Sequence, residues 1–76
     1  MKKEDLQKLL GSHIRKIREK KSLSQKDLAN AIGKDQQSIQ RIETGNINPS
    51  FYYLFEISKG MNVTLKELLD FKIPEE

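Results

Sequence analysis

The stretch of sequence that decides the fold is SQKDLANAIGKDQQSIQRIETG, residues 24–45. It contains two short segments of helical apolar periodicity, one on each side of a glycine. Ser24, with Asp27 three residues later, forms a variant of the capping box and predicts where the first segment begins. Gly33 predicts where that segment ends, because glycine readily adopts the left-handed conformation found after helices.

Another helix, the third of the chain, is predicted from residue 36 to residue 44. Asp35 is its expected N-cap and Gly45 follows its end. Two short helices joined around a glycine are typical of a helix-turn-helix. Ala29 agrees with this interpretation, because a small side chain lets the two helices approach closely. An αα-corner in any small helical protein has the same pattern, so this stretch alone leaves both interpretations open.

The residues before this stretch predict a helix at about residues 5–21, with Asp5 as its N-cap. Gly11 interrupts this helix at some cost in helix propensity. The apolar residues recur at the spacing of one helix face: they are Leu6, Leu9, Leu10, Ile14 and Ile17.

The residues after this stretch predict two more helices. Ser50 is the expected N-cap of a fourth helix that carries four aromatic residues near its start, and Asn62 is expected to end it in the left-handed conformation. Thr64 and Glu67 form another capping box for a short fifth helix, whose apolar residues are Leu65, Leu68 and Leu69. The sequence therefore predicts an all-α fold of five short helices, the second and third forming the helix-turn-helix.

Length and composition narrow the range of functions. The chain has 76 residues, which is one domain at most, and no cysteine, which excludes disulfides and cysteine-ligated metal sites. The single histidine, His13, cannot build a metal site alone, and no cofactor is expected. No apolar run is long enough to span a membrane, and the N-terminus is not a signal peptide, so a cytoplasmic location is expected. No nucleophile motif is present, and no enzyme activity is expected.

The charge of +3 is unevenly distributed along the chain. Residues 1–34 hold ten basic and four acidic residues, whereas residues 35–76 hold four basic and seven acidic residues. A basic half favours an anionic partner, although a solvated surface without a partner can have the same composition. The basic residues Lys16, Lys20 and Lys21 are interpreted more readily as a solvated face than as a phosphate-binding one.

The predicted third helix exposes a face of unusual composition. At about 100° per residue, Ile39 and Ile42 point to the core and small Ser38 can pack near the second helix. The opposite arc has neither Glu nor Lys and consists of Gln36, Gln37, Gln40, Arg41 and Thr44. Gln pairs with adenine and Arg with guanine through two hydrogen bonds in the major groove, so this arc favours DNA reading over an ordinary solvated face.

With these residues the chain resembles the lambda-repressor and Cro-like helix-turn-helix family, also called the Xre family. The resemblance lies in IRKIREKKSLSQKDLANAIGKDQQSIQRIETGNINPS and continues through LFEISKGMNVTLKELL. It covers residues 10–69, the expected domain, with residues 1–9 as an N-terminal extension of the first helix and residues 70–76 as a short tail. The family fold is a five-helix domain that places its third helix in the major groove.

The resemblance also implies roles for individual residues. Gln36, Gln37, Gln40 and Arg41 are expected to contact base edges. Gln25 is expected to hold a phosphate and to support Gln36. The expected backbone contacts are Gln25, Lys26, Lys34, Thr44, Asn46 and Asn48, and Arg18 is expected to form a structural ion pair with Glu43.

Some positions depart from the family pattern. Asp35 places a carboxylate where Ser or Thr is usual, near the expected phosphates, and Gly60 stands where alanine is commoner. Lys34 replaces a common apolar residue. The fourth helix is unusually aromatic, and most of its aromatic residues are expected in the core, with one or more at a subunit interface: they are Phe51, Tyr52, Tyr53 and Phe55.

The function expected from the residues and the resemblance is sequence-specific binding of double-stranded DNA as a transcriptional regulator, a repressor acting as a homodimer on a palindromic operator. The candidate dimer contacts are Leu65, Leu69, Phe71 and Ile73. For the last two of these, a frayed exposed tail is the alternative. Two other functions stay open: an antitoxin that binds a toxin protein and represses its own operon, and a controller of a restriction–modification system.

Overall fold

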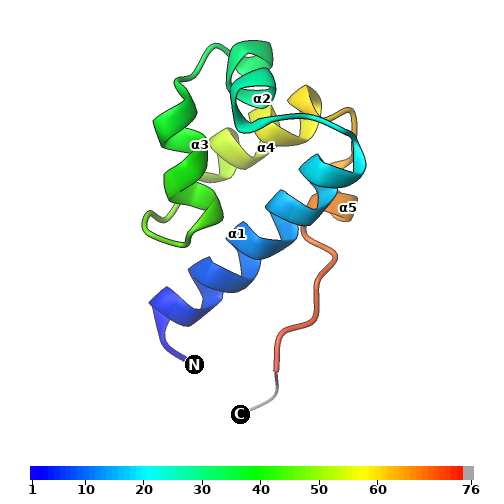
Figure 1. The fold of residues 1–76 in the computed structure, drawn as a ribbon. Coiled ribbons are helices and arrows are strands. Elements are labelled where there is room, and N and C mark those ends of the chain that lie inside the picture. Colours follow the sequence, from blue (N-terminus) through cyan, green and yellow to red (C-terminus); the bar gives the residue numbers. More distant parts are fainter. Residues whose placement is uncertain (75–76) are drawn as a thin grey trace.

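The computed structural model describes residues 1–74, which form five helices and no strand (Figure 1). The predicted all-α fold is therefore confirmed for this part of the chain. Residues 75 and 76 of the expected tail lie outside the described residues. In chain order the helices are α1 (Lys3–Lys20), α2 (Gln25–Ile32), α3 (Gln36–Glu43), α4 (Phe51–Gly60) and α5 (Leu65–Leu68).

Most of the predicted helix ends are confirmed, because short-range hydrogen bonds fix them. Ser24 and Asp27 form both halves of the capping box at the start of α2, with two N–H···O distances of 2.9 Å. The side chain of Asp35 accepts from the third residue of α3, and that of Ser50 does the same for α4. The φ angle of Asn62 is 57°, the predicted left-handed conformation.

The predicted start of α1 is wrong. The helix begins at Lys3, and Lys2 is the N-cap residue without a side-chain cap bond. Asp5 lies inside the first turn with Glu4, where a carboxylate stabilises the positive end of the helix dipole. An acidic residue can have this effect anywhere in the first turn and need not be the cap. Asp5 therefore indicates that a helix starts nearby but does not identify its first residue.

The buried face of α1 is also rotated from the predicted one. Its buried residues are Gln7, Gly11, Ile14 and Arg18, whereas Leu6 is 40% exposed. This stripe packs against the C-terminal end of α3. At Gly11 an added Cβ would overlap the carbonyl oxygens of Ile42 and Glu43, so glycine permits the close approach of the two helices.

The expectation that the aromatic residues of α4 lie mostly in the core is wrong. Phe51 and Tyr52 are 69% and 67% exposed and Phe55 is 39% exposed; Tyr53 is half-buried against the core. A ten-residue helix on the surface buries one stripe, and in α4 that stripe is Leu54, Ile57 and Ser58.

One core joins all five helices. α3 packs against α1 and α2, α4 packs against α2 and α5, and α5 packs against α1. Ala29 on α2 is 1% exposed and belongs to this core. The largest fully buried side chains of this core are Ile14, Leu28, Ile39, Ile42, Ile57, Met61 and Leu68. The core therefore fixes the inner face of α3 and leaves its outer face to solvent.

Candidate nucleic-acid interface

The outer face of α3 is polar along its whole length. Ile39 and Ile42 are each 1% exposed on the inner face, which turns the predicted arc outward. The exposed residues on this face are Gln36, Gln37, Gln40, Arg41 and Thr44. The Thr44 hydroxyl donates to the carbonyl oxygen of Gln40 at 2.9 Å, so it serves the end of the helix. The other four side chains extend into solvent from a helix whose inner face is packed in the core.

A hollow of about 330 Å³ lies where α2 and α3 meet, and it is open to solvent. Its lining consists of four amide side chains: Gln25, Gln36, Gln37 and Gln40. Each glutamine offers one acceptor oxygen and two donor N–H groups. Such a surface can bond to base edges and to phosphate oxygens, and it carries no negative charge that would repel them.

The C-terminal end of α3 is held by a buried ion pair. The Arg18 Nε donates to Glu43 Oε2 at 2.6 Å, and Nη2 donates to Oε1 at 2.9 Å. The hydrogen bonds to Glu43 raise the pKa of Arg18 above its ordinary value, against the opposing effect of burial. Arg18 also donates to the Leu23 carbonyl at 2.7 Å. The negative charge of Glu43 is therefore compensated inside the protein.

Gln25 is tied to this ion pair. Its Nε2 donates to Glu43 Oε1 at 3.0 Å, and the side chain is half-buried at the first position of α2. Gln25 and Gln36 line the same hollow, but the amide hydrogen bond is made to Glu43. The two expected roles of Gln25, toward a phosphate and toward Gln36, stay predictions.

The residues expected to contact the DNA backbone differ in whether their side chains are already engaged within the protein. Lys26, Asn46 and Asn48 are exposed. The Lys34 ammonium instead lies 3.6 Å from Glu56 Oε1 and 5.2 Å from the centroid of the Tyr53 ring. Lys34 is therefore engaged with α4 in this structure, and a phosphate contact by this residue would compete with two internal ones.

Two contacts that hold α3 were missed in the sequence. Gln7 Nε2 donates to the Gly45 carbonyl at 3.0 Å, just after α3. The hydroxyls of Ser38 and Tyr53 are 2.6 Å apart, so the Ser38 side chain bonds to α4. Neither pair has a local sequence pattern, because the partners lie 38 and 15 residues apart.

The candidate dimer residues fall into two groups. Leu69 and Ile73 are 42% and 51% exposed, so they are free to meet a second copy. Leu65 is partly buried against the core. The centroid of the Phe71 ring lies 5.3 Å from that of His13. Phe71 therefore packs on α1, which differs from the alternative of a frayed tail.

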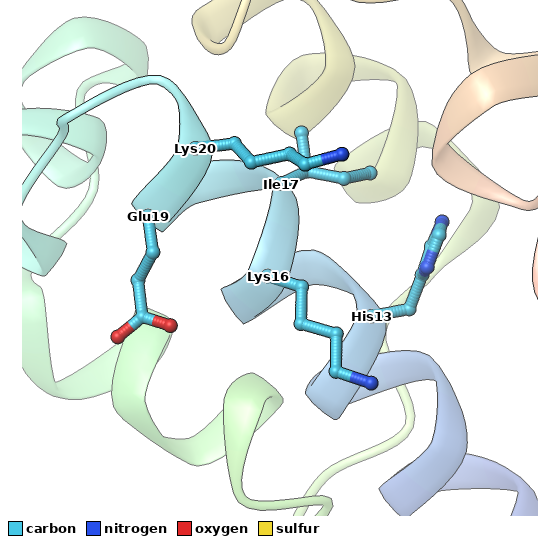
Figure 2. A pocket seen from close by; sticks show the side chains of 5 residues that line it. All are labelled: His13, Lys16, Ile17, Glu19 and Lys20. Atoms are coloured by element: carbon cyan, nitrogen blue, oxygen red, sulfur yellow. The ribbon is translucent and has the colours of Figure 1, made fainter.

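A second hollow lies along α1 and is shown in Figure 2. It is lined by His13, Lys16, Ile17, Glu19 and Lys20. Both lysines are exposed, and Glu19 pairs with Arg15 at 3.4 Å. His13 Nε2 lies 3.1 Å from the Glu67 carbonyl oxygen on α5. This surface is open and of mixed charge, which agrees better with a solvated face than with a phosphate-binding one.

Across residues 1–74, no helix has the length and apolar character needed to cross a membrane. In the same range, no three His, Cys, Asp or Glu side chains gather where they could hold a metal ion.

Comparison with known proteins gives consistent matches. The model of the helix-turn-helix family matches residues 14–68. A helix-turn-helix-type transcriptional regulator of Sinorhizobium fredii is 32% identical over 65 residues, which cover 86% of this chain and 84% of that protein. The control protein C.MunI of a Mycoplasma species is 38% identical over 65 residues, covering 84% of this chain and 88% of the relative.

A solved structure agrees with these sequence matches. The restriction-modification controller protein C.AhdI from Aeromonas hydrophila superposes with a TM-score of 0.80 at 27% identity. The superposition covers 83% of this chain and 96% of the controller.

Proposed function

Because the chain belongs to the helix-turn-helix family of transcriptional regulators, we propose that it binds a specific sequence of double-stranded DNA with α3 in the major groove. The observation that carries the proposal is the outer face of α3, with three exposed glutamines and one arginine over a fully buried inner face. These are the residue types that pair with adenine and guanine edges.

In this proposal the contacts divide between bases and backbone. The residues at or near the N-terminal end of α3 enter the groove first. The proposed base-reading residues are Gln36, Gln37, Gln40 and Arg41. The proposed backbone contacts are Gln25, Lys26, Lys34, Thr44, Asn46 and Asn48. Backbone contacts fix the register of the protein on the duplex, and base contacts select the sequence.

We propose a homodimer on a palindromic operator as the active form, acting as a repressor in the cytoplasm, and no enzyme activity. One such domain buries about 600–1,000 Å² on DNA, the lower end for specific binding, so two copies double the readout. The exposed side chains of Leu69 and Ile73 support a contact through the C-terminal segment. Half-sites would then lie about 34 Å apart, one turn of the duplex.

A second candidate is narrower: control of a restriction–modification system. The two matches to C.MunI and C.AhdI support it. Both candidates use the same DNA-binding face, so they differ in the genes that the protein regulates. The antitoxin alternative rests on the resemblance alone.

The test is selection of bound sequences from random duplexes by the full chain. We expect one recurring motif with two inverted half-sites. Binding with a steep salt dependence but without a motif would contradict the proposal, because phosphate contacts alone give that behaviour.

A further inference from the structure

Tyr53 on α4 makes a contact with α3 that is not one of the proposed base contacts. Its ring is half-buried, and its hydroxyl lies 2.6 Å from the Ser38 hydroxyl on the first turn of α3. α3 packs closely against α1 and α2, and α4 against α2 and α5. The hydroxyl pair is therefore a direct side-chain link between α3 and α4.

The two residues of this link are themselves fixed by the caps of their helices. The Ser38 backbone N–H donates to Asp35 Oδ1 at 2.7 Å, which is the cap of α3. The Tyr53 backbone N–H donates to Ser50 Oγ at 3.0 Å, which is the cap of α4. The link therefore joins the first turn of one helix to the first turn of the other.

Gln36 and Gln37 lie within this fixed turn, between the cap residue Asp35 and Ser38. At the other end of α3, the ion pair of Arg18 and Glu43 holds the helix to α1. The end of α3 that is proposed to enter the groove first is thus held by different contacts from the end that is anchored to α1.

The tyrosine ring is also held by a basic residue. The Lys34 ammonium lies 5.2 Å from the ring centroid and 3.6 Å from Glu56 Oε1. Lys34 stands just before the cap of α3, so it connects the turn between α2 and α3 to α4. A ring held in this way keeps its hydroxyl at a defined place.

We infer that Tyr53 is a positioning residue for base recognition: its hydroxyl, through Ser38, sets the orientation of the α3 turn that carries Gln36 and Gln37. This inference rests on the proposed DNA binding. Tyr53 acts on sequence discrimination without contacting a base. Removal of the hydroxyl alone keeps the ring that Lys34 contacts. It should therefore leave the phosphate contacts, and with them the affinity for unrelated DNA, unchanged.

The test compares Tyr53→Phe with Tyr52→Phe in the full chain. The first change removes the linking hydroxyl and keeps the ring, whereas the second removes a hydroxyl from a neighbouring tyrosine that is 67% exposed. Affinities are measured for the selected operator, for operators with one base pair changed, and for unrelated duplex DNA, over a range of salt concentrations. Thermal melts verify that each variant is folded at the assay temperature.

For Tyr53→Phe we expect discrimination between the operator and its single-base variants to fall about three- to tenfold, the effect of losing one hydrogen bond. The salt slope and the affinity for unrelated DNA should not change, and Tyr52→Phe should match the wild type. Ser38→Ala should reproduce the loss, and the double variant Ser38→Ala with Tyr53→Phe should lose no more than either single variant.

Three results from the variants would overturn the inference. Unchanged discrimination by folded Tyr53→Phe would show that the hydroxyl does not position α3. An equal loss of affinity for all DNA by the folded variant would show that the hydroxyl supports backbone contacts and not base recognition. Additive effects of the two changes would mean that the residues act separately. A wild-type protein that selects no motif would remove the proposed function and this inference together, whereas a selective wild type with an equally selective Tyr53→Phe would remove the inference alone.

Discussion

Arg18 on α1 and Glu43 at the end of α3 form a two-point ion pair whose side chains are only 9% and 2% exposed. The guanidinium contacts both carboxylate oxygens, at 2.6 and 2.9 Å. It thereby joins the first helix to the last turn of the helix that presents the polar face.

Replacing Arg18 with Ala should destabilise the protein by about 3–5 kcal/mol, because a buried carboxylate loses its compensating charge. In so small a domain this loss could unfold it. Arg15→Ala is the matched control, since its pair with Glu19 is exposed at 62% and 55% and should contribute less than about 1 kcal/mol. The free energies of unfolding of the two variants, measured in denaturant, should differ clearly; similar values would argue against a structural role for the buried pair.

Replacing Gly11 with Ala should destabilise the protein although alanine favours helices. The added methyl group would meet the Ile42 and Glu43 carbonyls, and overpacking of this kind costs about 1–3 kcal/mol. Ser12→Ala, at an exposed neighbouring position, should be neutral or slightly stabilising. If Gly11→Ala raised the melting temperature as Ser12→Ala does, the close approach of α1 and α3 would be disproved.

Replacing Gln37 with Ala should reduce affinity for the cognate site by about 1–3 kcal/mol and relax the base preference at one position. Lys26→Ala should weaken binding to all sequences about equally and lower the salt slope by about 1. Titrations of both variants at several salt concentrations separate the two effects. An unchanged sequence motif for Gln37→Ala would mean that this residue does not read a base.

Replacing Ile73 with Asp should shift the protein toward monomer and weaken operator binding without unfolding it, because this side chain is 51% exposed. Sedimentation equilibrium, with and without a palindromic duplex, measures the change. Lys72→Asp, which alters charge at an exposed neighbour, is the control for a general electrostatic effect. A wild-type protein that stays monomeric at high concentration and binds DNA one to one would contradict the dimer.

The stability of the protein should fall in acid partly through Asp27. Hydrogen bonds from the Ser24 backbone and side chain hold the Asp27 pKa below its ordinary value of 3.8. A carboxyl group with a lowered pKa in the folded state stabilises that state above its unfolded pKa and loses the effect as the pH falls through the folded pKa. Asp27→Asn should therefore melt below the wild type at neutral pH, and the difference should shrink as the pH falls below 3.8. If the difference in melting temperature did not change with pH, the effect of the substitution would not come from the charge of the Asp27 carboxylate.

Most features set by nearby residues were predictable from the residues themselves. Features set by distant residues were not, apart from the Arg18–Glu43 pair that the family resemblance implied. Ser24, Asp35 and Asn62 act through bonds or angles within a few residues, so their patterns predicted the helix ends. The burial of Gln7 depends on the Gly45 carbonyl, 38 residues away, and no periodicity indicates such a partner.

The same reason explains the errors on α4 and α1. The aromatic residues at the start of α4 have the composition of a core, but their exposure depends on which side of the helix faces α2. Tyr53 alone among them is turned toward the interior, where Ser38 lies. Leu6 was expected in the core for its apolar side chain, yet the stripe that meets α3 runs through Gly11, the residue small enough for the contact.

The residues that anchor α3 are distinct from those that it exposes. Ile39, Ile42 and Glu43 hold the helix in place, while Gln37 and Arg41 extend into solvent. Substitutions at exposed positions away from such anchors usually change stability by less than about 0.5 kcal/mol. On the proposed DNA-binding function, the exposed positions can therefore change while the scaffold persists, and a few substitutions can give the protein a new target site without unfolding it.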